Sequence, residues 1–366
     1  MATITRVGLD FRAPVHFGRR GVGLNETTVT LPADSLFSAL CTTLAALEGG
    51  ERVTELLGRF PLFAQAEGPP VPPFRITSLM PTANGIDLLP MPLLHPKLAR
   101  DSIATRKETK SIAWVSRAIF EKLIAGHDFA EDDDAVDRQS GQEHRPYTVQ
   151  GGDVSVTRKE QERLGGKMAV LWEVATRPRV AVDRRTSASA AFSSGSVFFA
   201  DSDRVHTGLY TLIRREPVDS DLTTLLESTF RALGDDGLGG ERAYGLGHFQ
   251  PEFSTVTDIA GAPHGEYFTT LAPYLPQPQE YGVFSGAVRY SIALRRGWLS
   301  MPGYANLRRP TIRMVDTGAV LRMPESGSVA GSLADATPTI AQNALAIRRY
   351  GIAWPVPVSA AAIMGK

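Results

Sequence analysis

Residues 237–247 read GLGGERAYGLG and place five glycines between two regular segments. The segment before them, Leu222 to Leu233, has apolar residues at helical spacing, and the segment after them, Gly247 to Phe253, is typical of a strand. Glycines let a backbone turn sharply and leave N–H groups accessible to a phosphate chain. Arg242 adds a positive charge, and Tyr244 offers a ring on which a base can stack. The run indicates either a phosphate-binding loop or a plain glycine-rich turn.

Two common nucleotide-binding motifs do not fit this run. A Walker loop needs Lys and then Ser or Thr after its second glycine, but Leu246 and Gly247 follow Gly245. A dinucleotide fingerprint follows a strand and opens a helix, which is the reverse of the order here. The pair Asp235–Asp236 resembles the acidic pair of polymerase palms, but it ends a helix, which Gly237 is expected to terminate, instead of lying on a hairpin. We therefore expect no metal site.

The rest of the chain supplies further regular elements. Residues 3–11 alternate apolar and polar side chains and predict a half-buried first strand. A helix is predicted to open at Pro32-Ala33-Asp34, with Asp34 as its cap, and to end at Gly49-Gly50. Another helix is predicted at 111–124. Strands are predicted at 74–80, 86–89, 149–156, 168–182 (split by Pro178), 197–200 and 209–214.

This order of strand, helix, strands, helix, glycine-rich loop and strand is typical of a ferredoxin-like domain with insertions. We predict an α+β fold of two such RNA-recognition-like (RRM-like) domains in tandem, with the glycine-rich loop before the last strand of the first. The first domain is residues 1–254, with an insertion around 95–165 that carries an exposed acidic run. The second is residues 255–366, a degenerate β-rich copy, and the boundary lies in the Pro- and Gly-rich stretch 259–278.

Basic and acidic residues are equal in number over the whole chain, but they are unevenly distributed along the sequence. The 366 residues contain 39 Lys and Arg and 39 Asp and Glu, so any RNA footprint must be local. Residues 281–315 have no acidic residue but include Arg308 and Arg309. Residues 96–122 have seven basic residues against three acidic ones, among them Lys97, Lys107 and Lys110. A third cluster, residues 9–26, contains Arg12, Arg19 and Arg20. Each cluster alone also fits a solvated face, but the three together predict a groove that neutralises phosphates.

Several classes of protein are excluded by counting. The single cysteine, Cys41, rules out a disulfide framework and an array of zinc knuckles. The histidines form no HExxH pair. No signal peptide and no apolar stretch of about 20 residues is visible. We expect a soluble cytoplasmic protein without a cofactor, a metal or a membrane partner.

His16 is the one histidine whose position allows a catalytic role. It follows the first strand, beside Arg19 and Arg20. A histidine so placed can act as general acid or base when a 2′-OH attacks a phosphate. A structural role or a simple RNA contact is the alternative.

Five groups of residues, in order along nearly the whole chain, resemble the RAMP superfamily, and within it the fourth subunit of the type III-A (Csm) CRISPR interference complex. They are VHFG at 15–18 with GLNE at 23–26 and PADSLFSAL at 32–40; LPMPL at 89–93 with WVS at 114–116; PRVAVDRRT at 178–186; LGGERAYGLGHF at 238–249; and RGW at 296–298, RR at 308–309, GAVL at 318–321 and RYGIAWPVP at 349–357.

The resemblance implies a non-catalytic subunit that binds the CRISPR RNA (crRNA) in antiviral defence. Such a subunit holds the repeat-derived 5′ tag of the guide and docks the large polymerase/cyclase-domain subunit, with the repeated backbone RAMP subunit as a further partner. The implied tag contacts are His16, Arg19, Ser35, Arg179, Arg184, Thr186, Gly239, Gly240, Arg242 and Gly245. The loop and the basic clusters add Arg20, Lys97, Lys107, Lys110, Arg185, Tyr244, Gly247, Arg308 and Arg309.

The alternative is an enzyme of the same superfamily. A metal-independent endoribonuclease would process the precursor transcript with His16 as its catalytic residue. No Tyr or Lys lies beside His16 in the sequence as a partner, and the motif at 178–186 resembles that of the effector subunit. We therefore expect no enzymatic activity.

Overall fold

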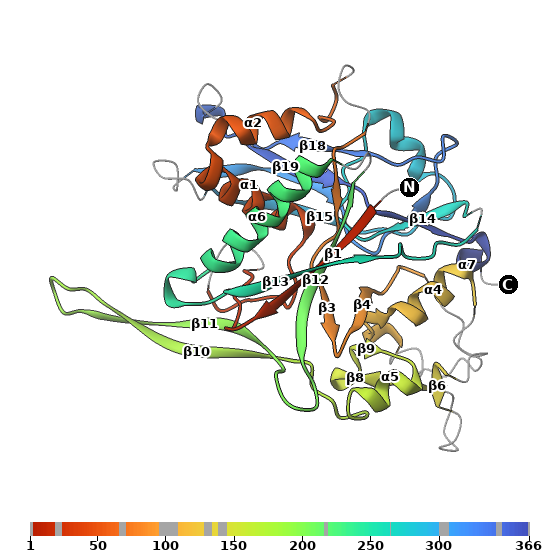
Figure 1. The fold of residues 1–366 in the computed structure, drawn as a ribbon, viewed down its shortest axis with the longest axis horizontal. Coiled ribbons are helices and arrows are strands. Elements are labelled where there is room, and N and C mark those ends of the chain that lie inside the picture. The colour runs from red at the N-terminus through yellow and green to blue at the C-terminus, as the bar shows by residue number, and fades with distance from the viewer. Residues whose placement is uncertain are drawn as a thin grey trace.

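A computed structural model describes residues 3–18, 24–65, 71–94, 109–127, 134–137, 145–215, 219–263, 265–299, 307–341 and 346–364. Figure 1 shows a body of sheets and helices from which one long hairpin projects. The predicted mixture of helices and strands is confirmed. Within these ranges, no helix is both long and apolar enough to cross a lipid bilayer.

The largest sheet has nine strands, and four of them, starting at one edge, run in the order β13–β1–β12–β3. Neighbouring strands in this group are antiparallel. The predicted first strand is confirmed, and its side chains Val7 and Leu9 are buried on one face. The bounds of the four strands are Thr3–Phe11 for β1, Met80–Ala83 for β3, Thr207–Arg215 for β12 and Phe249–Val256 for β13. The other five are β2 (Arg75–Ile76), β4 (Ile86–Pro90), β5 (Trp114–Ser116), β8 (Thr148–Val149) and β9 (Val154–Ser155).

Two long helices follow two of these strands and contact each other. Helix α1 (Ala33–Glu48) follows β1, and α6 (Ser220–Asp236) follows β12 and leads to β13. The side chain of Asp219 caps α6 by accepting a hydrogen bond from the N–H of Leu222 at 3.0 Å. Gly237 ends α6 with φ 82°, as the sequence predicts. Both helices are therefore confirmed close to their predicted bounds.

The predicted cap of α1 is wrong. Pro32 occupies the cap position, and no side chain accepts a hydrogen bond from the first turn there. Asp34 lies inside that turn and is fully buried, because its carboxylate pairs with arginines from the C-terminal part of the chain. Gly49, with φ 88°, does end α1, but a second helix that the sequence did not indicate, α2 (Gly50–Gly58), begins at the next residue.

Two segments in the predicted insertion differ from the sequence-based assignment. The helix predicted at 111–124 is a strand, β5, followed by helix α4 (Arg117–Ala125). The strand predicted at 149–156 is two short strands, β8 and β9, joined by the turn η2 (Gln150–Gly152). The remaining elements of this part are β6 (Val136–Asp137), β7 (Arg145–Pro146) and α5 (Arg158–Arg163). Of the acidic run, residues 131–133 lie outside the described residues.

The projecting hairpin consists of β10 (Trp172–Val182) and β11 (Ser189–Phe199) (Figure 1). The predicted break at Pro178 is wrong, because Pro178 lies within the ladder opposite Ser193. In a two-stranded hairpin each strand has a free edge, where a residue without an N–H group is tolerated. The hairpin is therefore continuous along its whole length.

The C-terminal part is rich in strands, as predicted. Its elements form one three-stranded sheet, β17–β14–β20, and two hairpins, β15–β16 and β18–β19. The strand bounds are β14 Tyr267–Thr270, β15 Ile292–Trp298, β16 Arg308–Val315, β17 Val320–Arg322, β18 Gly331–Asp335, β19 Arg348–Ile352 and β20 Pro355–Val358, and the helical turns are η4 (Pro278–Phe284), η5 (Thr339–Ala341) and α7 (Ala360–Met364). The division of the chain at residue 254 stays a prediction.

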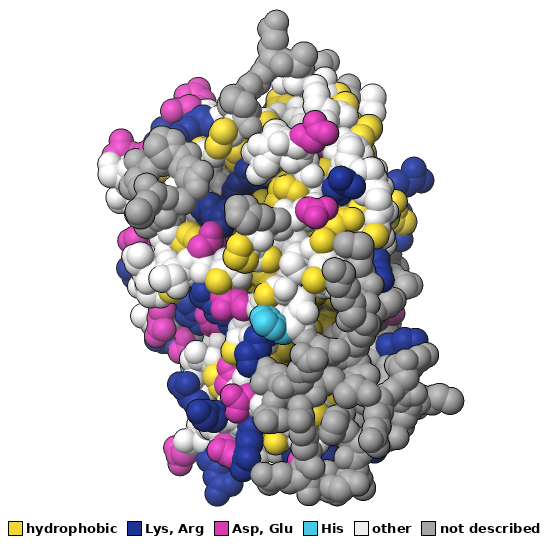
Figure 2. All heavy atoms as spheres, turned by 90° about the vertical axis from the view of Figure 1, so that its right-hand side faces the viewer, with side chains coloured by type: hydrophobic (Ala, Val, Ile, Leu, Met, Phe, Trp, Pro, Cys, Tyr) yellow, Lys and Arg dark blue, Asp and Glu magenta, His cyan; other side chains and the backbone are white. Residues whose placement is uncertain are grey.

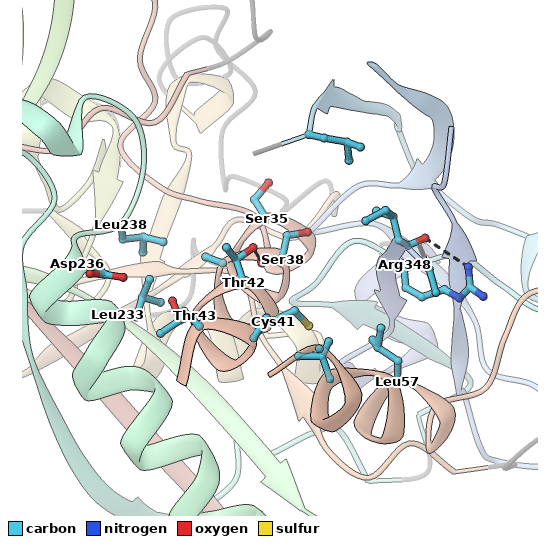
Figure 3. Close-up of a pocket in the computed structure, with 18 of the residues that line it drawn as sticks. Ser35, Ser38, Cys41, Thr42, Thr43, Leu57, Leu233, Asp236, Leu238 and Arg348 are labelled. Atoms are coloured by element: carbon cyan, nitrogen blue, oxygen red, sulfur yellow. Dashed lines mark hydrogen bonds between the residues drawn. The ribbon is translucent and has the colours of Figure 1, made fainter. Parts of the chain in front are cut away.

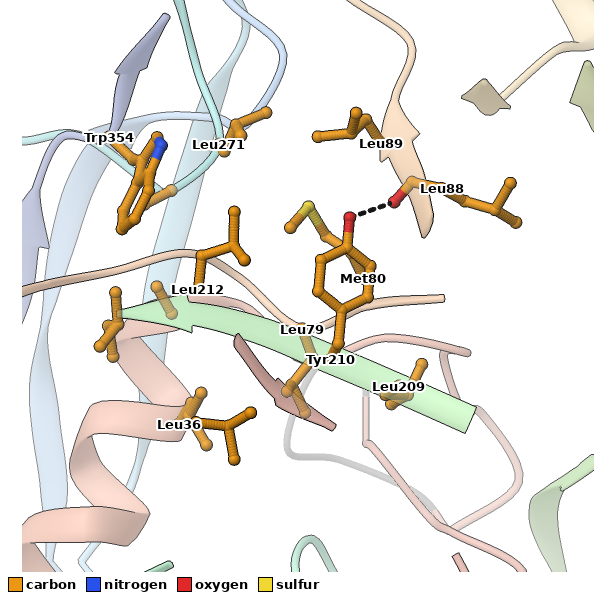
Figure 4. Close-up of a cluster of buried hydrophobic side chains, with 14 of the residues drawn as sticks. Leu36, Leu79, Met80, Leu88, Leu89, Leu209, Tyr210, Leu212, Leu271 and Trp354 are labelled. Carbon is orange, nitrogen blue, oxygen red and sulfur yellow. Dashed lines mark hydrogen bonds between the residues drawn. The ribbon is translucent and has the colours of Figure 1, made fainter. Parts of the chain in front are cut away.

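One hydrophobic core joins the central sheet to the C-terminal part (Figure 4). Leu212 of β12 belongs to the same cluster as Leu271 and Trp354, which come after residue 255. Trp354 is fully buried, and the guanidinium of Arg214 lies 4.6 Å from the centre of its ring. Nearby, the hydroxyl of Tyr210 donates a hydrogen bond to the carbonyl of Leu88 at 3.1 Å. The two parts of the chain therefore fold around shared apolar surface.

We predict that Trp354→Ala lowers the free energy of unfolding by roughly 3–5 kcal/mol, because it leaves a cavity in this shared core. The matched control is Trp298→Ala, which truncates a tryptophan with 41% of its surface exposed, and should cost less than about 1 kcal/mol. Urea denaturation of both variants measures the difference. Equal losses would contradict the placement of Trp354 in the core.

Candidate nucleic-acid interface

The glycine-rich loop is folded back on itself and onto the segment after β1. The N–H of Leu238 donates to the carbonyl of Gly247, and the N–H of Gly247 donates to that of Pro14, both at 2.9 Å. The N–H of Gly240 donates to the carbonyl of His16, also at 2.9 Å. The expectation that the loop presents free glycine N–H groups is therefore wrong at these positions.

The glycines serve close packing instead. A Cβ atom on Gly239 would lie 2.6 Å from the carbonyl oxygen of His16, and one on Gly247 would lie 2.2 Å from that of Leu238. Gly239 also has φ 104°, which a residue with a side chain rarely adopts. Gly245, with φ 82°, closes the helical turn η3 (Arg242–Tyr244). These glycines fix the shape of the loop, and their predicted RNA contacts stay predictions.

His16 lies beneath this loop and not on its surface. Its side chain is 4% exposed, and Nδ1 lies 2.7 Å from the carbonyl oxygen of Gly195 on β11. A Cβ atom on Gly240 would lie 2.8 Å from the imidazole ring. The burial of His16 favours a structural role, while its predicted contact with RNA stays a prediction. Arg19 and Arg20 lie outside the described residues.

An ion pair that the sequence did not indicate ties the loop to the projecting hairpin. Glu241 accepts hydrogen bonds from Ser194 of β11 and, at 3.2 Å, from Nη1 of Arg179 on β10. The guanidinium of Arg179 also lies 4.8 Å from the ring centre of Tyr244, which is 69% exposed. The structure thus brings together Arg179 and Tyr244, two predicted site residues, as a cation and an aromatic ring at the surface.

A cavity of about 1010 Å³ opens beside the loop (Figure 3). One wall is the face of α1 that carries the small side chains Ser35, Ser38 and Thr42. The loop and the end of α6 form a second wall, and β16 and β19 reach it from the C-terminal part. Four of the predicted site residues meet here, namely Ser35, Gly239, Arg242 and Arg309.

The strands that reach the cavity from the C-terminal part are held against α1 by ion pairs with Asp34. Arg295 of β15 forms an ion pair with Asp34, with Nη2 2.8 Å from Oδ1, and donates from Nε to Oδ2 at 3.0 Å. Arg349 of β19 pairs with the same carboxylate. Arg295 also donates to the hydroxyl of Ser35 at 3.1 Å, and Arg309 to that of Ser38 at 3.4 Å. These contacts place two hairpins against the first turns of the helix.

This cluster carries more positive than negative charge. Three guanidinium groups, those of Arg295, Arg309 and Arg349, lie around the single carboxylate of Asp34. Burial and the positive charges of Arg349 and Arg295 lower the pKa of Arg309 to about 10, so it remains protonated at neutral pH. Its Nε has no hydrogen-bond partner among the described residues. The wall that includes Arg309 is therefore suited to an anion, although Glu51 and Asp236 line other parts of the cavity.

The remaining predicted contacts lie apart from the cavity. Arg184, Arg185 and Thr186 form the exposed tip of the projecting hairpin, where the N–H groups of Arg185 and Thr186 bond the Asp183 carboxylate and lower its pKa. Arg308 is exposed and lies 4.4 Å from the ring centre of Trp298. Lys110 is exposed within the insertion, and Lys97 and Lys107 lie outside the described residues.

Acidic side chains do not gather into a metal site in the described part of the chain, where no group of three or more His, Cys, Asp or Glu could hold an ion. Asp235 and Asp236 are the last residues of α6, as predicted. Figure 2 shows basic and acidic side chains intermixed on the face turned toward the right of Figure 1. On that face neither positive nor negative side chains dominate, whereas the three arginines around Asp34 concentrate positive charge.

Comparisons with known proteins agree with the predicted resemblance. Residues 263–358 match the model of the CRISPR Csm4 C-terminal domain. The chain is 24% identical over 325 residues to the CRISPR system Cms protein Csm4 of Mycobacterium tuberculosis, covering 86% of this chain and 87% of that protein. It is 24% identical over 297 residues to the Csm4 protein of Thermococcus onnurineus, covering 81% and 83%.

Solved structures show the same fold. A chain of the Csm3–Csm4 subcomplex of a type III-A CRISPR-Cas interference complex superposes with a TM-score of 0.65, at 16% identity and over 97% of this chain and 99% of that one. A chain of a Csm1–Csm4 cassette in complex with AMPPNP gives 0.53, at 17% identity and over 98% of both chains. The resemblance to the fourth Csm subunit that the sequence predicts is therefore confirmed.

We predict that Asp34→Asn lowers the free energy of unfolding by roughly 3–5 kcal/mol, because it leaves buried guanidinium groups without their counter-charge. The control is Glu162→Gln, which removes an exposed carboxylate paired with Arg158 on α5 and should cost less than about 1 kcal/mol. Denaturant titration checks both values. A loss at Asp34 no larger than at Glu162 would contradict the buried ion pairs.

Proposed function

Because this chain resembles Csm4 proteins over most of its length, we propose that it is a crRNA-binding, non-catalytic subunit of a type III-A CRISPR-Cas effector complex. It holds the repeat-derived 5′ tag of the crRNA and acts in the cytoplasm in antiviral defence. The observation that carries the proposal is the cavity between α1 and the glycine-rich loop, where four predicted contact residues meet under an excess of buried positive charge.

The chemistry of this cavity suits a single-stranded RNA backbone. Guanidinium groups make strong charge-assisted hydrogen bonds to phosphates, and both Arg242 and Arg309 line the cavity. Ser35 and Ser38 add hydroxyl groups that can bond phosphate or 2′-OH oxygens. The short side chains of this face of α1 leave room for the sugar–phosphate chain itself.

Tyr244 supplies the contact to a base. Its ring is largely exposed, and Arg179, held by Glu241, lies against it. Unstacked RNA bases stack on aromatic side chains, at roughly 1–3 kcal/mol per base. A tag nucleotide leaving the cavity can therefore stack on Tyr244 beside the loop.

The proposed partners follow from the relatives. Their structures are a Csm3–Csm4 subcomplex and a Csm1–Csm4 cassette. We propose that this chain likewise contacts a backbone subunit and docks the large polymerase/cyclase-domain subunit.

The proposed architecture is two ferredoxin-like domains in tandem. In support, the strand order β13–β1–β12–β3, with α1 after β1 and α6 between β12 and β13, is the order of a ferredoxin-like sheet. The sheet β17–β14–β20 and its neighbouring hairpins are then the degenerate second copy. The cavity lies between α1 of the first copy and strands β16 and β19 of the second.

The alternative, an endoribonuclease that uses His16, fits the geometry less well. A general acid or base must reach the proton that it transfers, and His16 lies under the loop with Nδ1 at the Gly195 carbonyl.

His16→Ala in the purified chain, incubated with precursor transcript, separates the two functions. We expect neither variant nor parent to cut RNA; cutting by the parent that His16→Ala abolishes would support the enzyme.

We predict that Arg242→Glu weakens binding of a tag-containing RNA at least five-fold, because an exposed cation at the cavity becomes an anion. Tyr244→Ala should weaken it by about 1–3 kcal/mol through loss of one stacked base. Filter binding at two salt concentrations measures both, and the salt dependence should decrease for Arg242→Glu alone.

Arg231→Glu is the matched control for charge, since Arg231 is exposed on α6, lies 5.1 Å from the ring centre of Phe253 and does not line the cavity. Its RNA affinity should remain within two-fold of the parent. An equal loss at Arg231 and Arg242 would show a diffuse electrostatic effect and contradict the proposed site.

A further inference from the structure

The hairpin β15–β16 has two faces of different character. Its inner face carries Arg295 and Arg309, which reach Asp34 and Ser38 on α1. Its outer face carries Ile292, Leu294 and other side chains that alternate with the inner ones and are exposed. Every outward side chain of β15 is exposed, whereas on β16 Val315, which lies opposite Ile292, is buried.

Three of the four outward side chains of β15 are apolar, namely Ile292, Leu294 and Trp298. Leu294 is 54% exposed and Trp298 is 41% exposed, on the same side of β15. Before this strand in the chain, the rings of Tyr290 and Phe284 lie 5.1 Å apart, and those of Phe284 and Tyr281 lie 6.5 Å apart. Isolated exposed apolar side chains are normal, but these three follow one another along one side of a single strand.

The charges on this face are all positive. Arg296 and Arg313 are exposed there, and Arg308 covers one side of the Trp298 ring. Leu294 lies opposite Arg313 in the register of the two strands. Residues 281–315 contain no Asp, Glu or Lys. Aromatic residues and Arg are enriched in protein interfaces, whereas Lys, Glu and Asp are depleted.

We propose that this face docks a protein subunit that presents an apolar surface bordered by Asp and Glu side chains. The inference rests on the proposed function, since it names the surface by which the chain joins its complex. The hairpin is held to the body by the contacts of Arg295 and Arg309 with α1 and by the buried side chains Met314 and Val315 of β16. The exposed side chains of its outer face therefore remain available to a partner. A partner with acidic groups would pair with Arg296 and Arg313.

RNA is the less suitable occupant of this face. Ile292 and Leu294 are aliphatic and give no ring on which a base could stack, and Arg308 covers one side of the Trp298 ring. The hairpin's contribution to the RNA cavity, Arg309, points to the opposite side. The same hairpin therefore faces RNA on one side and protein on the other.

Leu294→Asp and Arg296→Glu test this surface in the full chain. Binding to the purified large subunit and to the purified backbone subunit encoded beside the chain is measured by biolayer interferometry, together with RNA affinity by filter binding. We expect each variant to bind one of the two subunits at least ten-fold more weakly, with RNA affinity within two-fold of the parent. Met168→Asp, at an apolar residue that is 87% exposed outside this face, is the control and should change neither.

Two outcomes would overturn the proposal. Unchanged binding to both subunits would show that the face is free, and a loss of RNA affinity with unchanged subunit binding would assign it to RNA. Circular dichroism of each variant confirms that the chain remains folded. Failure of the proposed function itself gives a different result, since the parent chain would then not retain tag-containing RNA.

Discussion

The carboxylate of Asp34 joins helix α1 to the C-terminal strands β15 and β19. A fully buried charge is costly unless it is paired, and Asp34 receives two guanidinium groups, from Arg295 and Arg349. These partners come from β15 and β19, so the ion pairs fix both hairpins against the first turn of α1. These ion pairs set the spacing between α1 and the C-terminal strands, and the cavity lies in the space between them. The same charges that hold the fold thus make the wall of the proposed RNA site positive.

The other wall is fixed by close packing and by one ion pair. The glycine-rich loop closes over His16 at distances that leave no room for Cβ atoms, and Glu241 ties it to the projecting hairpin through Arg179. In the proposed function, a site formed by such packing would lose little ordering entropy when RNA binds. The cations and hydroxyls of the cavity, with His16 under the loop, support the proposal that the chain holds RNA and does not cut it.

Local sequence patterns predicted the elements with strong periodicity. β1, α1, α6 and the strand after the glycine-rich loop follow from apolar spacing and from Gly237 as a terminator. Asp34 was assigned as a cap because an acidic residue near a helix start looks the same whether it caps or is buried. Its true partners lie 261 and 315 residues away in sequence. β5 depends likewise on pairing with β4 and β9, which no local pattern reveals, and the role of Glu241 depends on the distant hairpin.

We propose that the chain caps the tag end of a guide RNA within a larger complex. The most direct measurement is to purify the tagged chain with the proteins encoded beside it and to sequence the RNA that remains bound. We expect small RNAs that share one repeat-derived 5′ end, together with a large polymerase-domain subunit. Recovery of RNAs without a common 5′ end, or of no RNA at all, would contradict it.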